Sequence, residues 1–236
     1  MSQQEDTKVY QITEAFETCK KEGWIEKLLV LEGLDRWCIV VDSDELLDFV
    51  GSETHTLQEM IHTAQSRGYK RLGGAMLDMY AKDGLFSQGE SFIEALRFFD
   101  KDSYTVINTD CVYPLHNITV FGGPRDRLLG GKRSISKQAV FFYDKDSIYI
   151  RCHFMYPFMC TKDVPRWYVL RHYKFLKYDK EEYLRRAREK CFYNGSVEYQ
   201  IVESLDSAMS FYYEGSQEYI DSSSLRCLPF IEDIQW

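Results

Sequence analysis

One stretch near the start of the chain constrains the fold more than any other. Five apolar residues, Trp37–Val41, run directly into the acidic residues Asp42, Asp44 and Glu45. A short continuous apolar run of this kind is typical of a strand that is buried on both faces, as in the middle of a parallel sheet. Ligands of open α/β sheets bind outside the carboxyl ends of such strands. The stretch therefore predicts a core strand that presents three carboxylates at a ligand-binding edge.

This acidic cluster has the composition of a divalent metal site. Asp42 and Asp44 are two residues apart, so their side chains point to the same side of an extended backbone. Carboxylate oxygens are ligands that Mg²⁺ and Mn²⁺ prefer, and Glu45 adds another carboxylate beside them. Two further Asp-x-Asp patterns, at 100–102 and 144–146, each have Lys in the middle and polar surroundings. We interpret those two as solvated turns.

Composition limits the class of protein. The 236 residues are enough for one well-buried domain, and we expect a single domain over 1–236. The net charge of −8 argues against a nucleic-acid-binding surface. No apolar run approaches the roughly 20 residues of a membrane-spanning helix, and no signal-peptide pattern opens the chain. Seven scattered cysteines without Cys-x-x-Cys spacing are typical of reduced thiols in a cytoplasmic protein.

The order of the predicted elements favours an α/β fold with a mostly parallel sheet. Apolar residues at helical spacing predict helices over 11–31 and 57–66, the second opened by the capping box Thr56–Glu59. A second core strand is predicted over 70–80, with Asp78 near its end. A strand–helix–strand passage of this kind favours a right-handed crossover between neighbouring parallel strands.

The second half of the chain is predicted to continue with a hairpin and end in a helical region. Alternating residues predict a hairpin of 138–143 with 147–153, which places His153 at the end of a strand. A lone His in such a place is more often structural than a ligand. Two helices are predicted over 180–193 and 197–213, so that a helical tail begins at about residue 180.

A basic segment lies between these regions. Gly122 and Gly123 precede Arg125 and Arg127, and Lys137 follows them closely. Glycines let a backbone approach a ligand, and Arg offers paired hydrogen bonds to a phosphate. Two interpretations stay open for these cations. They bind a diphosphate, or they form an ordinary solvated basic face, which is the commoner fate of charged residues.

Taken together in chain order, these motifs resemble a known family. Residues 37–46 are similar to the core signature of family 2-type glycosyltransferases, in the branch that carries an Asp-x-Asp-Glu motif. Each further motif is short, and the ordered set is more specific than any one of them. The resemblance covers roughly residues 10–215. The stretches that carry it are 37–46, 76–80, 122–127, 136–153 and 170–175.

The resemblance implies a GT-A fold, with a mixed, mostly parallel sheet flanked by helices. In that fold a Rossmann-like lobe precedes the Asp-x-Asp strand and holds much of the nucleotide base. Only 41 residues precede Asp42 here. We therefore expect the N-terminal part of the nucleotide-binding lobe to be missing or shortened.

The resemblance also implies an activity. It is the transfer of a sugar from a nucleotide-sugar, with a UDP-sugar favoured, to a hydroxyl of a glycan or lipid-linked acceptor in polysaccharide synthesis. The implied cofactor is Mn²⁺ or Mg²⁺, which neutralises the charge of the departing nucleoside diphosphate as a Lewis acid. The implied location is the cytoplasm or the inner face of the membrane, and a homo-oligomer is compatible with it.

Residue roles follow from the resemblance. Asp44 is the principal metal ligand, Asp42 contacts the ribose or the metal, and Glu45 orients the site or adds a metal ligand. His153 is ranked as a further metal ligand ahead of His172. The remaining donor-binding residues are His172, Arg125, Arg127 and Lys137.

An inverting transferase also needs a carboxylate that takes the proton of the acceptor hydroxyl. Asp78 is the first candidate for this base, and Asp100 and Asp110 are the next candidates. The alternative for Asp78 is a purely structural role as a helix or turn cap. Two other functions stay open. One is a non-catalytic domain that binds a partner or glycan, and the other is a metal-dependent hydrolase of phosphoesters or sugar nucleotides.

Overall fold

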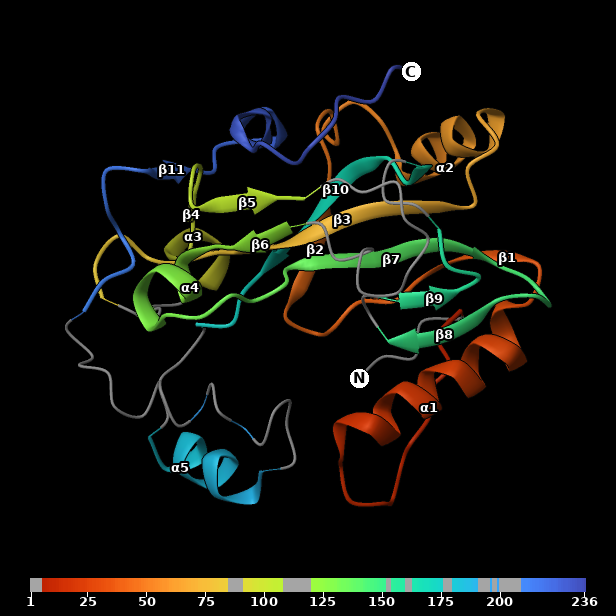
Figure 1. Ribbon diagram of the computed structural model, residues 1–236, viewed down its shortest axis with the longest axis horizontal. Helices are drawn as coiled ribbons and strands as arrows, with labels where there is room; N and C mark the ends of the chain where they lie inside the picture. Colours follow the sequence, from red (N-terminus) through yellow and green to blue (C-terminus); the bar gives the residue numbers. More distant parts are fainter. Residues whose placement is uncertain are drawn as a thin grey trace.

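The computed structural model describes residues 6–84, 91–107, 120–151, 154–159, 163–175, 180–190, 196, 199 and 209–236. A strongly curled five-stranded sheet lies at the centre of the molecule (Figure 1). Its strands, in spatial order, are β1 (Arg36–Ile39), β7 (Ser136–Tyr143), β3 (Arg71–Asp78), β10 (Arg166–His172) and β2 (Glu45–Asp48).

The sheet is mostly antiparallel, so the predicted α/β fold with a mostly parallel, GT-A-like sheet is wrong. Strands β1 and β7, β7 and β3, and β10 and β2 pair antiparallel, and β3 with β10 is the one parallel pair of this sheet. β1 and β3 do run in the same direction, because both are antiparallel to β7. However, β7 lies between them, so they are not the crossover-linked neighbours that the sequence predicts.

The apolar run that suggested a central strand forms an edge strand instead. β1 ends at Ile39, and the side chains of Ile39 and Val41 are 37% and 43% exposed. One face of β1 packs toward the helical segment that precedes it, because Cys38 and Val40 join a cluster around Leu29. A short apolar run does not distinguish a strand buried by two neighbouring strands from an edge strand that a helix covers.

Strands β3 and β10 are the true centre of the sheet. Alternate residues of each strand enter two separate apolar clusters, one on each face. Leu77 and Val169 belong to one cluster, whereas Leu72 and Leu170 belong to the other. Burial of both faces fixes the register of these two strands, because a shift by one residue would move every side chain to the opposite face.

The helices of the described part are short. The capping box predicted at α2 is confirmed: the Thr56 side chain accepts from the Glu59 backbone N–H, and the Glu59 carboxylate accepts from the Thr56 N–H. In Figure 1, α1 lies below β1 and α2 lies at the opposite side of the sheet. The helices are α1 (Thr18–Leu28), the π-helix η1 (Leu29–Gly33), α2 (Leu57–Ser66), α3 (Phe92–Ala95), α4 (Pro124–Leu129), α5 (Lys180–Glu189) and the 3₁₀ helix η4 (Ser222–Cys227).

Three small sheets surround the central one. They pair β4 (Phe98–Asp100) with β11 (Ser216–Glu218), β5 (Tyr104–Val106) with β6 (Val120–Gly122), and β8 (Ile148–Arg151) with β9 (Phe154–Tyr156). The predicted hairpin is therefore wrong, since β7 pairs with β1 and β3 while β8 pairs with β9.

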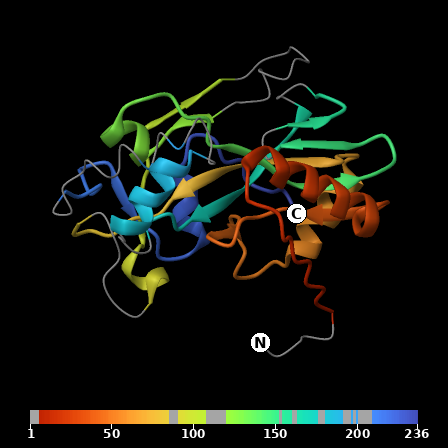
Figure 2. The ribbon, with the colours of Figure 1, turned by 90° about the horizontal axis from the view of Figure 1, so that it is seen from below.

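At both ends of the chain, part of the region predicted to be helical is not helical. The segment before α1 is exposed (Figure 2), and Lys8 and Tyr10 connect it to η1 through their contacts with Glu32. At the other end, α5 confirms a helix after residue 180, but the described residues from 209 onward contain only β11 and η4. The rest of the second predicted helix, 197–208, lies mostly outside the described residues. In the described part of the chain, no helix is long and apolar enough to span a membrane.

Candidate functional site

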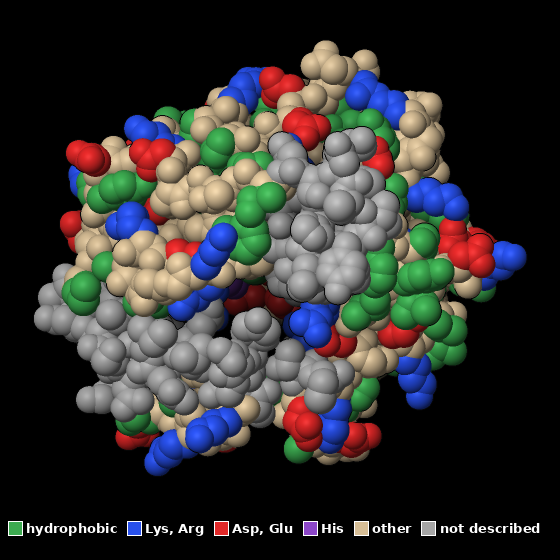
Figure 3. Space-filling model, viewed as in Figure 1, with side chains coloured by type: hydrophobic (Ala, Val, Ile, Leu, Met, Phe, Trp, Pro, Cys, Tyr) green, Lys and Arg blue, Asp and Glu red, His purple; other side chains and the backbone are tan. Residues whose placement is uncertain are grey.

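The strand directions bring distant polar residues to one edge of the sheet. β1, β3 and β10 end at this edge, whereas β7 and β2 begin there. In the register of the sheet, His172 at the end of β10 lies between Asp78 at the end of β3 and Glu45 at the start of β2. The surface is hollowed near the centre of the view in Figure 3, where acidic and His side chains lie at depth beside Lys or Arg side chains.

A chain of four charged side chains runs through this edge. His172 Nε2 lies 3.4 Å from Asp44 Oδ2, and His172 Nδ1 lies 2.6 Å from Asp78 Oδ1. The other oxygen of Asp78 accepts a hydrogen bond of 2.7 Å from Arg125 Nε. His172, Asp78 and Arg125 are buried, whereas the side chain of Asp44 is 36% exposed. The chain thus links a buried Arg to a carboxylate at the surface.

Charges along this chain stabilise one another. Burial alone lowers the pKa of His172, but its contacts with Asp44 and Asp78 outweigh burial and raise it. The contact with His172 lowers the pKa of Asp44 to about 2. Burial raises the pKa of Asp78, but the Arg125 guanidinium and the His172 ring hold it well below its ordinary value. Each of these three groups therefore favours the charged form of its neighbours.

Glu45 shapes the acidic turn rather than facing the surface. Its backbone N–H donates to the Asp42 carbonyl at 3.1 Å, and its carboxylate accepts from the Asp42 N–H at 3.0 Å. The same carboxylate forms a buried ion pair with Lys137. Glu45 thus fixes the backbone from which Asp42 and Asp44 project, and its predicted roles, to orient the site or to add a metal ligand, stay predictions.

Asp42 lies between two lysines. Lys137 Nζ is 3.4 Å from Asp42 Oδ2, and Lys21, from α1, pairs with the other oxygen. Burial raises the pKa of Asp42, but these lysines outweigh burial and lower it. Sequence reasoning missed Lys21 as a site residue. In the sequence, Lys21 is only a charged residue at one end of the apolar stripe of a predicted helix. That pattern does not show that this end of the helix lies beside Asp42.

The Gly122-Gly123 pair and Arg127 have structural partners. Gly122 has a φ of +111°, and a Cβ atom there would lie 2.2 Å from the Ser103 carbonyl oxygen, so the close approach is to the chain itself. Arg127 donates to both oxygens of Asp100, at 3.0 and 3.1 Å, and Asp100 is fully buried. The diphosphate role of Arg127 and the fallback base role of Asp100 stay predictions, and both side chains are already engaged.

The predicted residues thus gather only in part. Asp42, Asp44, Glu45, Asp78, His172, Arg125 and Lys137 lie at one edge of the sheet, and Arg127 lies on the same helix as Arg125. His153 and Asp110 lie outside the described residues. The base role of Asp78 stays a prediction, although both of its oxygens are bound and the geometry gives it the task of holding the His172 ring.

The donor atoms present suit a metal ion that a ligand helps to hold. In the described residues, no group of three or more His, Cys, Asp or Glu side chains is placed to hold a metal by itself. Asp44 and His172 nevertheless offer an oxygen and a nitrogen 3.4 Å apart. Mg²⁺-type sites commonly use one or two carboxylates and complete their coordination with water and substrate phosphates. Two donors do not make a metal site by themselves, so a metal held here would need water or a bound ligand to complete its coordination.

Asp78 strengthens this fit. A metal-binding His commonly donates its other ring N–H to a carboxylate, which fixes the orientation of the ring and makes the free nitrogen more basic. Asp78 stands in that position at Nδ1 of His172, and Nε2 faces Asp44. Arg125 in turn fixes Asp78.

No family model, curated protein or solved structure matches the chain. The geometry of the site and the sequence motifs are therefore what bears on function.

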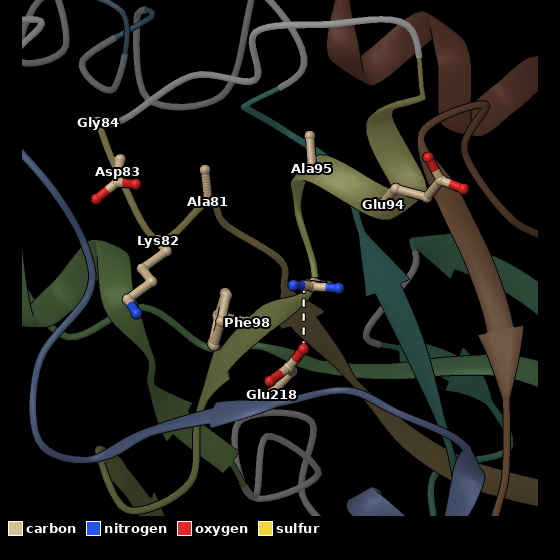
Figure 4. Close-up of a pocket in the computed structure, with 9 residues that line it drawn as sticks. Ala81, Lys82, Asp83, Gly84, Glu94, Ala95, Phe98 and Glu218 are labelled. Carbon is tan, nitrogen blue, oxygen red and sulfur yellow. Dashed lines mark ion pairs between the residues drawn. The ribbon is translucent and has the colours of Figure 1, made fainter.

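A second hollow lies beyond the end of β3, with a volume of about 680 Å³. Lys82 and Asp83 line it from the segment that follows β3, and Glu94 lines it from α3 (Figure 4). Arg97 and Glu218, also in its wall, form an ion pair of 3.1 Å. Because side chains of both signs line this pocket, its charge selects neither an anion nor a cation.

Proposed function

We propose that this chain is a metal-dependent glycosyltransferase that binds the diphosphate of a nucleotide-sugar at the edge formed by β1, β3 and β10. The observation that carries the metal–diphosphate part is the pair formed by Asp44 and His172, with Asp78 behind the ring. The sugar part rests on the resemblance of the ordered motifs to family 2-type glycosyltransferases.

The charge balance of the site supports this ligand. Four carboxylates, Asp42, Asp44, Glu45 and Asp78, are opposed by three cations, Lys21, Lys137 and Arg125, and by the ring of His172 when it is protonated. A metal on Nε2 takes the place of that proton, because a His ligand is neutral, and a site with nearly balanced charges has little net attraction for a free anion. A divalent cation together with a diphosphate adds almost no net charge, so it fits better than either component alone.

The residues divide the work. Asp44 and His172 supply the protein ligands, and Asp78 and Arg125 hold the ring in the orientation that directs Nε2 outward. Lys137 and Lys21 stand beside Asp42, where a cation is in place to neutralise the charge that develops on a departing phosphate. A bound metal would supply Lewis-acid stabilisation of that same charge.

Calorimetry of UDP binding with and without Mn²⁺ tests the proposal. We expect the wild-type chain to bind UDP at least tenfold more tightly with Mn²⁺, and Asp44→Asn to lose that gain. Asp146→Asn is the matched control, because it makes the same substitution in an exposed Asp-x-Asp turn. The proposal would be refuted if Mn²⁺ did not change the UDP affinity of the wild-type chain, or if the Asp44→Asn variant kept the full increase in affinity with Mn²⁺.

A second measurement separates transfer from hydrolysis. UDP release from a panel of UDP-sugars is followed in the presence of Mn²⁺, with and without added acceptor sugars. Release that depends on an acceptor is expected of a transferase. Release at one rate regardless of acceptor would assign the site to a hydrolase.

A further inference from the structure

A buried polar cluster connects the C-terminal segment to the two strands beside the candidate functional site. At its centre is Asp48, the last residue of β2, whose side chain is 4% exposed. One of its oxygens, Oδ1, accepts hydrogen bonds from the Phe49 N–H at 2.9 Å and from Ser52 Oγ at 2.7 Å. These two donors are local, whereas the partners of the other oxygen come from distant parts of the chain.

Two residues meet at Oδ2 of Asp48. Arg171, on β10, places its Nε 3.0 Å from this oxygen, and Tyr219, directly after β11, donates its hydroxyl hydrogen to it. The Arg171 guanidinium also lies over the Tyr219 ring, 4.3 Å from the ring centroid, where cation–π attraction adds to the contact. Tyr219 thus holds β2 through its hydroxyl and β10 through its ring.

β2 depends on such contacts because it is a short edge strand. It has four residues and pairs with β10 on one side, and no strand of the described chain pairs with its other side. In the register, Arg171 lies opposite Leu46, whereas Asp48 lies opposite Val169. The ion pair of Arg171 with Asp48 is therefore a diagonal contact between the strands, and sliding of β2 along β10 would separate it.

The candidate functional site lies at the other end of the same two strands. Asp44 directly precedes β2, and its carbonyl oxygen accepts a hydrogen bond of 2.8 Å from the Tyr173 N–H. About four residues of extended chain, roughly 13 Å, separate Asp44 from Asp48. The distance of 3.4 Å between Asp44 Oδ2 and His172 Nε2 therefore depends on where β2 lies along β10.

The C-terminal segment also contacts the loop that follows β2. Ser222 Oγ accepts a hydrogen bond of 2.8 Å from the Gly51 N–H, and the Ser222 N–H donates to the Glu53 carboxylate at 2.6 Å. The ring of Trp236 stacks on His55, with the ring centroids 3.8 Å apart. These contacts hold the loop and so limit how far β2 can move.

We infer that Tyr219 is a positioning residue of the candidate functional site, which holds β2 on β10 so that Asp44 stays beside His172. The inference rests on the proposed function for the task of the Asp44–His172 pair, but not for the way in which the pair is held. Tyr219 acts on the site through Asp48 and Arg171 and not by contact with a ligand.

Two Tyr→Phe substitutions form a matched test. Tyr219→Phe keeps the ring beneath Arg171 and removes the hydroxyl from Asp48. Tyr143→Phe is the control, because the Tyr143 hydroxyl also donates to a carboxylate, that of Glu26, at 2.8 Å. Tyr143 lies at the end of β7, whereas β7 begins at the edge of the sheet that carries the site. Each variant therefore loses one hydrogen bond to a carboxylate, at opposite ends of the sheet.

Hydrogen exchange of the Tyr173 amide measures how often β2 opens at Asp44. A hydrogen bond to a charged group shifts such an equilibrium by about tenfold, so Tyr219→Phe is expected to speed Tyr173 exchange by about that factor. Tyr143→Phe is expected to leave Tyr173 exchange nearly unchanged. Equal acceleration in the two variants would show a general loss of stability and would overturn the inference.

A double-mutant cycle tests whether Tyr219 acts through Asp48. In the Asp48→Asn background, Tyr219→Phe is expected to change Tyr173 exchange clearly less than in the wild type. The same change in both backgrounds would overturn the inference. The comparison of Tyr219→Phe with Tyr143→Phe decides the inference even where Asp48→Asn fails to fold.

Calorimetry of UDP binding separates this inference from the proposed function. Tyr219→Phe is expected to lose part of the increase in UDP affinity that Mn²⁺ gives the wild type, and Tyr143→Phe is expected to keep all of it. A wild type without any Mn²⁺ effect would refute the proposed function, while the exchange of Tyr173 would still decide the inference. A Mn²⁺ effect that Tyr219→Phe leaves whole would overturn the inference alone.

Discussion

Replacing Gly74 with Ala tests how the centre of the sheet is packed. A Cβ atom at position 74 would lie 2.3 Å from Cε2 and 2.5 Å from Cδ2 of Tyr168. Tyr168 is fully buried and lies across the gap that Gly74 leaves open. Its hydroxyl accepts a hydrogen bond of 2.6 Å from the Ala139 N–H and lies 3.0 Å from the Lys137 carbonyl oxygen. The ring therefore cannot move without breaking its contacts with β7.

The expected cost follows from two effects. Extra volume in a well-packed core costs about 1–3 kcal/mol. If the ring shifts, the buried Ala139 N–H loses its partner at a further cost of about 1–3 kcal/mol. A total of about 3 kcal/mol corresponds to a drop in Tm of roughly 6–12 °C for a domain of this size.

Urea unfolding, followed by far-UV circular dichroism and tryptophan fluorescence, measures this cost. Gly23→Ala is the matched control, because Gly23 lies inside α1 and a Cβ there meets no atom within 4 Å. Ala is favoured over Gly in a helix by about 0.5–1 kcal/mol, so this variant is expected to be more stable than wild type. The same substitution is thus expected to have opposite signs at the two positions.

A double-mutant cycle identifies the cause. Tyr168→Leu removes the ring, so Gly74→Ala is expected to cost clearly less in that background than in the wild type. An unchanged cost in both backgrounds would show that the ring is not what excludes a side chain at position 74. A Gly74→Ala variant with the urea midpoint of wild type would refute the packing argument altogether.

Three further predictions concern the charged groups. Lys137→Met leaves the buried carboxylate of Glu45 without this cation and is expected to lower the free energy of unfolding by about 3–5 kcal/mol, measured in urea. Arg127→Met is expected to cost a similar amount, about 3–5 kcal/mol, because Asp100 is fully buried; a neutral result would favour a ligand-binding role for Arg127. Folding raises the pKa of His172, so the stability it contributes is complete below the ordinary pKa of about 6.5 and is lost as pH rises through the higher folded value. In EDTA, His172→Gln is expected to lack this decline in urea midpoint, and a parallel decline in both proteins would refute the assignment.

Local signals in the sequence predicted local structure well. The capping box at Thr56 and Glu59 specified the start of α2, because both of its hydrogen bonds form within four residues. The predicted strand over 70–80 corresponds to β3, which ends at Asp78. In each case the atoms that stabilise the element lie inside the element or next to it.

Strand pairing was not predictable in the same way. β7 pairs with β1 and β3, from which it is separated by about a hundred and by about sixty residues of chain, and no local pattern in residues 136–143 encodes those partners. The sequence places β1 and β3 in the correct relative direction but as neighbours. The insertion of β7 between them turns a parallel arrangement into a mostly antiparallel one.

The candidate site shows why part of it was predictable despite the wrong fold. Polar residues that follow apolar strands gather wherever several strands end together, whether the strands between them are parallel or antiparallel, so Asp44, Asp78 and His172 meet in this sheet as well. What the sequence could not reveal is the partner of each charge. The contact of His172 with Asp78 spans 94 residues, and that of Lys21 with Asp42 depends on the path of α1 back to the edge strand. Those pairings decide which side chains remain to bind a ligand, and they leave Asp44 with Nε2 of His172 beside it. Replacing this pair therefore discriminates most directly between a metal–diphosphate site and a structural ion network.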